Sequence, residues 1–264
     1  MVDEVEVEGL RIAYERAGSG PPLVLLHGFV GDSRGTWSHQ LEGLSDEFTV
    51  VAWDAPGAGF SSEVPDTFRL ADYADCLAGF VAALGLERPH IGGLSSGGAV
   101  ALEFYRRRPQ VPASLILASA YAGWAGSLPP EGVAQRLQFS LRVADLPVER
   151  LRAEMRPSVF SPAAPAEVVA GFLDSMATHQ PAGFRAMARS MAETDLRDVL
   201  SQIDVPTLVL AGDQDVRAPL EVAEALHAAI PRSELVVLAG VGHACSVEAP
   251  DRFNSAVRTF LHRL

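Results

Sequence analysis

Lysine is absent from the 264 residues, so arginine supplies all of the Lys+Arg count of 21. This absence excludes Schiff-base chemistry and any mechanism in which a lysine acts as acid or base. Cysteine is nearly as scarce, because only Cys76 and Cys245 occur. Two thiols are too few for a disulfide scaffold and indicate a reducing compartment. We expect Cys245 to line a pocket rather than to react.

Positive charge is in deficit, and the formal net charge is −12. This balance argues against nucleic acid and against anionic membrane surfaces as partners. Long apolar runs are missing too, since none approaches the roughly 18 residues that a membrane span needs. The first five residues are acidic and include no apolar segment, so we expect no signal peptide and a soluble, cytoplasmic protein.

What the chain does contain is a series of short apolar runs separated by helical patterns. Residues 5–15 alternate apolar and polar side chains around one glycine, which predicts a β-hairpin. Continuous apolar runs, typical of strands buried on both faces of a parallel sheet, occupy residues 23–26, 48–53, 91–93, 115–118, 207–211 and 235–238. Helical patterns occupy residues 68–84, 97–108, 220–230 and 250–264. This alternation predicts the α/β class, with right-handed crossovers.

The alternation breaks between Tyr121 and Asp204, where apolar residues recur at helical spacing and no buried strand is evident. Every methionine except Met1 falls in this stretch. Methionine is an adaptable apolar side chain. An all-helical insertion of this kind between two strands is favoured as an apolar roof over a pocket, although ordinary helix core gives the same pattern.

The most informative motif is Gly93-Leu94-Ser95-Ser96-Gly97, which follows a short strand and opens a helix. It fits the G-x-S-x-G pattern of a nucleophile elbow, in which the serine sits on a tight turn and its flanking positions must lack bulk. We choose Ser95 as the nucleophile over Ser96, because the position two before Ser96 is Leu94. A glycine-rich turn with serines present by chance is the alternative when this motif stands alone.

A serine nucleophile needs a base and a group that orients the base. His243 follows the last apolar run, so it should lie at the carboxyl edge of the sheet, where Ser95 also lies. Gly212-Asp213-Gln214-Asp215 follows the preceding run, and we choose Asp215 as the orienting acid with Asp213 as the fallback. The order Ser95, Asp215, His243 matches the order Ser…Asp…His. His27 lies at the same edge, but its position suits bracing of a loop.

An oxyanion needs two hydrogen-bond donors. One is the backbone N–H of Ser96, the residue after the nucleophile. We assign the other to the N–H of Phe29, in the loop that follows the first apolar run. A turn with no catalytic function is the alternative for this loop.

Five segments together resemble the α/β-hydrolase fold over nearly the whole chain: 27–29, 54–61, 93–98, 212–215 and 242–243. The resemblance implies an eight-stranded, mostly parallel sheet flanked by helices, with a core domain of residues 1–120 and 205–264 and a helical cap of residues 121–204. It also implies a structural role for Asp54 and supports Asp215 as the acid. Branches that use an aspartate nucleophile, cap tyrosines or a lysine do not fit, because Ser95 occupies the elbow, no tyrosine follows Tyr121 and lysine is absent.

These observations predict a serine hydrolase that cleaves a small ester or lactone with an apolar part, without cofactor or metal. We expect Trp37, Trp124 and Met187 to contact the substrate. One alternative is a carbon–carbon bond hydrolase acting on a vinylogous diketone, with Arg185 and Arg189 clamping a substrate carboxylate. Another is a ligand receptor, or a non-hydrolytic cyclase or lyase, that retains the pocket. The sequence leaves a monomer or a homodimer open.

Overall fold

The computed structural model describes residues 2–264, and its centre is one eight-stranded sheet in the order β1-β2-β4-β3-β5-β6-β7-β8. The strands are β1 (Asp3–Val7), β2 (Leu10–Ala17), β3 (Pro22–Leu26), β4 (Thr49–Trp53), β5 (His90–Leu94), β6 (Ser114–Ala118), β7 (Thr207–Gly212) and β8 (Ser233–Leu238). The β1–β2 and β2–β4 pairs are antiparallel, and all later pairs are parallel. The predicted eight-stranded, mostly parallel sheet is confirmed.

The hairpin of β1 and β2 turns at Glu8 and Gly9, whose φ angles are 50° and 82°. Positive φ at both central residues is what a type I′ turn requires, and this turn matches the twist of the strands it joins. The hairpin therefore forms the antiparallel edge of the sheet, beside the parallel strands β3 to β8.

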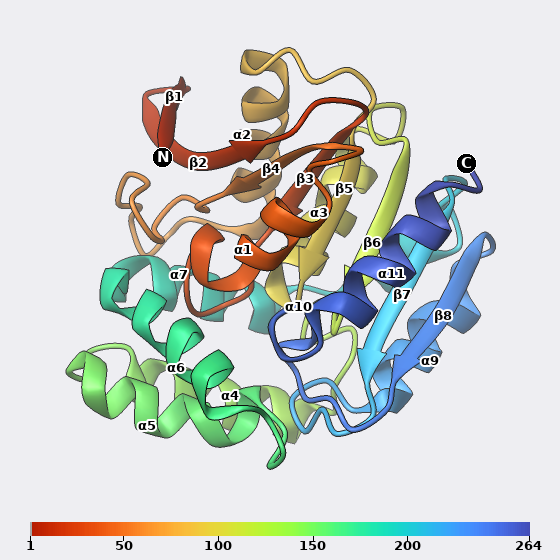
Figure 1. Cartoon of the computed structure of the whole chain (residues 1–264). Helices are drawn as coiled ribbons and strands as arrows, with labels where there is room; N and C mark the ends of the chain where they lie inside the picture. The colour runs from red at the N-terminus through yellow and green to blue at the C-terminus, as the bar shows by residue number, and fades with distance from the viewer. Residues whose placement is uncertain (1) are drawn as a thin grey trace.

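Helices cover both faces of the sheet (Figure 1). On one face lie α1 (Ser33–Gly43) and α11 (Pro250–Leu261), and on the other lie α2 (Leu70–Ala83), α3 (Ser96–Arg107) and α9 (Leu220–Ala229). Side chains of β3 alternate between the two faces, since Val24 and Leu26 pack toward α2 and α3 while Leu23 and Leu25 pack toward α1 and α11. Both faces are therefore dry, as the apolar runs predicted.

Two features differ from the sequence-based expectation. Strand β8 is only half-buried, and Val237 is 40% exposed, because β8 is the edge strand and has one strand neighbour. Helix α1 was not predicted. Its sequence is mostly polar, and its apolar pair Trp37 and Leu41 spans a single turn; an N-cap bond from Gly35 N–H to Asp32 Oδ1 begins it.

All the structure between β6 and β7 is helical: α4 (Pro130–Val143), α5 (Val148–Val159), α6 (Ala166–Ser175), the 3₁₀ turn η1 (Met176–Thr178), α7 (Pro181–Glu193) and α8 (Arg197–Leu200). We call residues 121–204 the helical insertion. Helices α4 to α7 gather at one end of the sheet (Figure 1). Val159 and Phe172 of the insertion share an apolar cluster with Val30 and Ala244, which lie in the loops after β3 and β8. The insertion therefore covers the edge where the parallel strands end.

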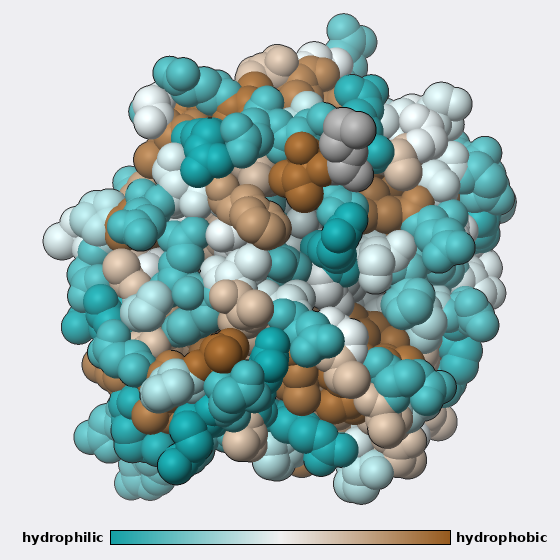
Figure 2. Space-filling view, turned by 60° about the vertical axis from the view of Figure 1, so that its left-hand side comes forward, coloured by the Kyte–Doolittle hydropathy of each residue, from teal (hydrophilic) through white to brown (hydrophobic). Residues whose placement is uncertain are grey.

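The surface shown in Figure 2 is mixed, with hydrophobic side chains in separate small patches among hydrophilic ones. Within residues 2–264, none of the helices combines the length and the apolar composition that crossing a bilayer requires.

Candidate active site

Ser95 stands between β5 and α3 in a backbone conformation that is rare for a residue with a side chain. Its φ is 55° and its ψ is −115°. The surrounding structure holds this strained turn, because the Ser95 N–H donates to Ala118 O at 2.8 Å. A Cβ on Gly93 would lie 2.3 Å from backbone atoms of Gly97, so the turn closes only with glycine there. This geometry has the form of a nucleophile elbow.

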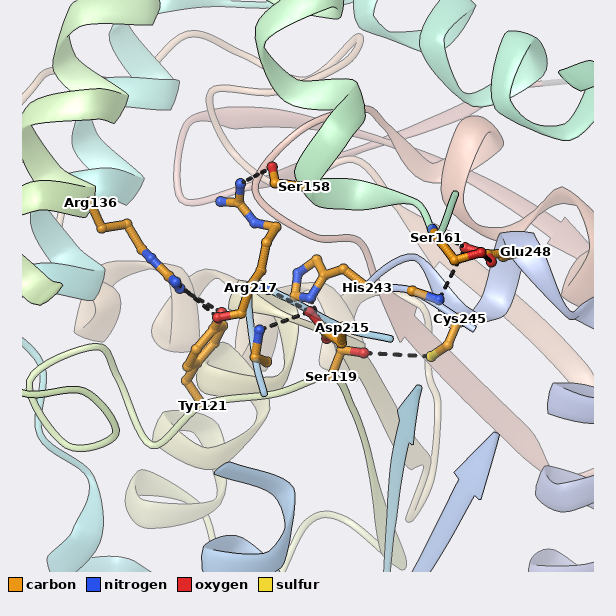
Figure 3. Close-up of polar contacts among 12 residues, drawn as sticks. Ser119, Tyr121, Arg136, Ser158, Ser161, Asp215, Arg217, His243, Cys245 and Glu248 are labelled. Atoms are coloured by element: carbon orange, nitrogen blue, oxygen red, sulfur yellow. Dashed lines mark hydrogen bonds and ion pairs between the residues drawn. The ribbon is translucent and has the colours of Figure 1, made fainter. Parts of the chain in front are cut away.

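Asp215 and His243 come from the loops after β7 and β8 and meet below the helical insertion (Figure 3). His243 Nδ1 lies 2.7 Å from Asp215 Oδ2. The other carboxylate oxygen, Oδ1, accepts the backbone N–H groups of Arg217 at 2.7 Å and Ala218 at 2.8 Å. Both side chains are buried, so the carboxylate fixes the ring with Nδ1 protonated and Nε2 free to accept a proton.

Burial by itself raises the pKa of the Asp215 carboxyl, because a charge is costly away from water. The opposing contributions from His243 and from the two backbone N–H donors outweigh burial, and the pKa of Asp215 lies below its usual range. Asp215 is therefore an anion beside the imidazole at neutral pH. Asp213, the fallback acid, is exposed, and its Oδ1 accepts the N–H of Gly240 instead.

The loop after β3 runs directly beside the elbow. A Cβ on Gly28 would lie 3.5 Å from Ser95 Cβ. Within residues 2–264, no protein group accepts the N–H of Phe29 or of Ser96, which is the first residue of α3 and has no intrahelical partner. These two free donors flank the elbow, as an oxyanion hole requires.

His27 and Asp54 brace this loop. His27 Nε2 accepts the N–H of Ala55 at 2.9 Å, and Nδ1 lies 2.7 Å from Gly28 O. Asp54 Oδ1 and Oδ2 accept the N–H groups of Ser33 and Phe60, each at 2.8 Å. Both ring nitrogens and both carboxylate oxygens are thus occupied by the backbone, which leaves neither side chain free for chemistry.

Ser95, His243 and Phe29 line one small, partly open cavity of about 20 Å³. Its other walls are mostly apolar and come from both the sheet-edge loops and the insertion: Gly28, Val30, Leu94, Val159, Phe172, Arg217 and Ala244. A space this size holds about one water molecule. The cavity is lined by the residue that carries the hydroxyl and by an imidazole that is paired with a buried carboxylate, while the free N–H groups of Phe29 and Ser96 lie in the adjoining loop and at the elbow. This arrangement suits attack on a carbonyl carbon.

Comparisons with known proteins identify the family to which this fold belongs. The sequence pattern of the α/β hydrolase fold matches residues 21–250. The chain belongs to the α/β-hydrolase fold family. An esterase from Thermogutta terrifontis, solved with malate bound, superimposes with a TM-score of 0.90 at 33% identity, covering 100% of this chain and 98% of that one.

Two sequence relatives extend the similarity. An uncharacterized Mycobacterium tuberculosis protein is 31% identical and covers 97% of this chain and 79% of its own length. RutD of Pantoea ananatis, a proposed carbamate hydrolase, is 31% identical, with 91% of this chain and 88% of RutD covered. The family and these relatives show that the chain is a hydrolase of the α/β fold.

The three residues expected to contact the substrate lie in different positions relative to the cavity that Ser95 lines. Trp37 does not line the cavity: its side chain is wholly buried against Phe253 in the core on the α1 face of the sheet, because α1 packs against the sheet. Trp124 does not line the cavity but stacks edge-on against Phe29, with ring centroids 5.9 Å apart. Met187 lines a neighbouring cavity of about 30 Å³, which Phe29 also borders.

Three further side chains are placed differently from the sequence-based expectation. Cys245 does not line the pocket; it is wholly buried, and burial raises the pKa of its thiol to about 12. Arg185 pairs with Asp66 and Asp145, so its charge is already matched. Arg189 is half-buried and lines neither cavity. The clamp proposed for the carbon–carbon hydrolase is therefore absent at these two positions.

Sequence reasoning missed Arg217 and Glu248. Arg217 follows Asp215 by two positions, so its charge at a strand end was the available signal. Glu248 on α10 (Cys245–Glu248) accepts the N–H groups of Gly242 and Ser161, each at 3.1 Å, and so ties the His243 loop to the insertion. No pattern in the sequence pointed to this contact.

Residues 2–264 contain no group of three His, Cys, Asp or Glu side chains placed to hold a metal.

Proposed function

We propose that the protein is a serine hydrolase that cleaves a small carboxylic ester or lactone with an apolar part. The pairing of His243 with Asp215 at 2.7 Å, on the same cavity as the strained Ser95, supports the proposal most directly. The apolar walls of that cavity favour an apolar acyl or alcohol part.

The chemistry follows from these positions. Ser95 Oγ attacks the carbonyl carbon while its proton passes to His243 Nε2, and the N–H groups of Phe29 and Ser96 stabilise the oxyanion. The same proton then goes to the leaving oxygen, which departs as an alcohol and leaves an acyl group on Ser95. Water gives a proton to His243 and attacks the acyl carbon, and the proton returns to Ser95 as the acid leaves. Asp215 stays ionised and stabilises the imidazolium.

Replacement of the nucleophile tests the proposal. We expect Ser95→Ala to lower kcat for p-nitrophenyl butyrate by roughly 10⁶-fold and to abolish labelling by a fluorophosphonate. Ser96→Ala is the matched control, since it removes the neighbouring hydroxyl but keeps the backbone N–H, and it should retain labelling and most activity. Full turnover by Ser95→Ala would sink the proposal. Wild-type labelling without turnover of any ester, lactone or carbamate would favour the ligand receptor.

A further inference from the structure

Arg217 is the one charged side chain, apart from the imidazole when protonated, among the described residues that line the cavity with Ser95 and His243. It lies on the loop after β7, and its backbone N–H is fixed by Asp215 Oδ1. The residue is only 9% exposed. Figure 3 shows its side chain rising from this loop toward the insertion, beside His243.

The guanidinium of Arg217 has few partners for a buried charge. It carries five N–H donors, but within residues 2–264 its side chain makes one hydrogen bond, from Nη1 to Ser158 Oγ at 3.0 Å. That partner is a neutral hydroxyl on α5, and no carboxylate of the described chain forms an ion pair with Arg217. Buried charges in proteins are ordinarily paired, because an unpaired one loses its hydration without compensation.

The neighbouring groups do not supply the missing anion. Both oxygens of Asp215 are already engaged by His243 and two backbone N–H groups. Burial raises the pKa of the Tyr121 phenol, which is therefore neutral, and its oxygen accepts Arg136 Nη1 at 2.6 Å. Arg136 adds a second positive charge, and its Nη2 donates to the Arg217 carbonyl at 2.8 Å. Arg217 is thus the cation at the cavity, Arg136 stands behind it on its carbonyl, and no carboxylate of the described chain forms an ion pair with either guanidinium.

We propose that Arg217 binds a carboxylate on the substrate, so that the preferred substrates are esters or lactones that carry a second, anionic carboxyl group. This inference rests on the proposed hydrolysis at Ser95. A guanidinium matches a carboxylate in a bidentate geometry. The apolar walls then contact the carbon atoms between the two carboxyl groups. A carboxylate fits better than a phosphate, because a single buried cation at the cavity leaves the second charge of a phosphate unmatched.

The test compares acidic and neutral esters of the same shape. The acidic series is monomethyl succinate, glutarate and adipate, and the neutral partner of monomethyl glutarate is methyl 5-methylhexanoate. We expect the wild-type protein to favour an acidic ester in kcat/KM by about 10-fold or more, as charged hydrogen bonds allow. Arg217→Gln should raise KM for the acidic ester by a similar factor and reduce the ratio of kcat/KM between the acidic and the neutral ester toward 1. Arg142→Gln is the matched control, because Arg142 on α4 lies at the surface and pairs with Glu154.

The outcomes separate this inference from the proposed function. A wild-type preference for the neutral ester, or an equal loss on both esters in Arg217→Gln, would overturn the role of Arg217 and leave hydrolysis at Ser95 intact. No turnover of either series by the wild-type protein would count against the proposed function as well. If Arg217→Gln does not fold, inhibition of neutral-ester hydrolysis in the wild-type protein by glutarate decides. Competitive inhibition at constant ionic strength supports the inference, and its absence overturns it.

Discussion

The loops at the carboxyl edge of the sheet and the helical insertion above them are held together in different ways. In the loops, polar side chains fix the backbone: Asp54 accepts two N–H groups, His27 accepts a third, and Asp215 accepts two more. Each of these acceptors is buried and satisfied, so the loops have few alternative conformations. The groups proposed for catalysis all stand on this part of the molecule.

The insertion meets the same loops through an apolar cluster and through hydrogen bonds, among them Gln180 Nε2 to Gly59 O and Arg217 Nη1 to Ser158 Oγ, each at 3.0 Å. Its cluster includes Val159, Phe160 and Phe172 against Val30 and Val247. Few polar contacts join its helices to the His243 loop: Ala244 N–H to Val159 O at 3.0 Å, and the contacts of Ser161 with Glu248. Apolar contacts are not directional, so they constrain the position of the insertion less tightly than the hydrogen bonds constrain the loops. The loops at the carboxyl edge are therefore fixed mainly by hydrogen bonds, whereas the helical insertion depends more on apolar packing.

The largest effect should come from the acid that orients the imidazole. We expect Asp215→Asn to lower kcat by about 10⁴-fold, because an amide favours the wrong tautomer of His243. Asp213→Asn is the matched control on the same loop, because this exposed side chain accepts Gly240 N–H and Gln214 Nε2 but does not contact His243, and it should stay within a few-fold of wild type. Steady-state kinetics with p-nitrophenyl butyrate measures both variants. Equal losses in the two would show that the loop needs both carboxylates merely for its shape.

Substitution of one glycine in each region compares the packing of the elbow with that of the helical insertion. Gly93→Ala places a Cβ 2.3 Å from backbone atoms of Gly97. Backbone atoms cannot move aside as a flexible side chain can, so we expect a loss of about 3 kcal/mol in unfolding free energy. Gly171→Ala, in α6 of the insertion, meets nothing within 4 Å and should stabilise the protein by about 0.5–1 kcal/mol. Urea unfolding measures both. A tolerated Gly93→Ala would mean that the elbow is looser than its geometry indicates.

The sequence predicted the rigid region better than the covering one, for physical reasons. Strands, elbow and strand-end groups such as Ser95 and His243 follow local rules, because apolar runs and glycine spacing determine where a strand ends. The burial of Trp37 in the core was not predicted, because nothing in the local sequence shows that α1 packs this ring against the sheet. Arg217 and Glu248 were missed because each matters through a distant partner, Ser158 and Ser161, that only the folded insertion brings near.

A smaller effect should follow from loosening the contact between the two regions. Glu248→Gln replaces the charged oxygen Oε2, which accepts the N–H groups of both Gly242 and Ser161, with a neutral amide oxygen. We expect a loss of about 1–2 kcal/mol in unfolding free energy, because two donors on buried residues lose a charged acceptor. The insertion should also become easier to displace, which is seen as faster tryptic cleavage within residues 121–204. Glu149→Gln, exposed on α5 and joined only to Arg152, is the control. Unchanged cleavage would show that apolar packing alone holds the insertion.

The smallest effect is a pH dependence that belongs to the rigid region alone. The pKa of Asp215 is lower in the folded protein than its unfolded value of about 3.9, so the unfolded chain binds the proton more readily. Its contribution to stability is therefore present above about pH 4 and is lost as the pH falls through the folded-state pKa. Urea unfolding at intervals from pH 6 downward measures the unfolding free energies of the wild-type protein and of Asp215→Asn. We expect the difference between the two to shrink below about pH 4. Asp213→Asn is the control for the loss of one negative charge. A difference that stays constant or grows in acid would mean that burial of the carboxylate outweighs its hydrogen bonds, and that the loop is less well preorganised than its contacts indicate.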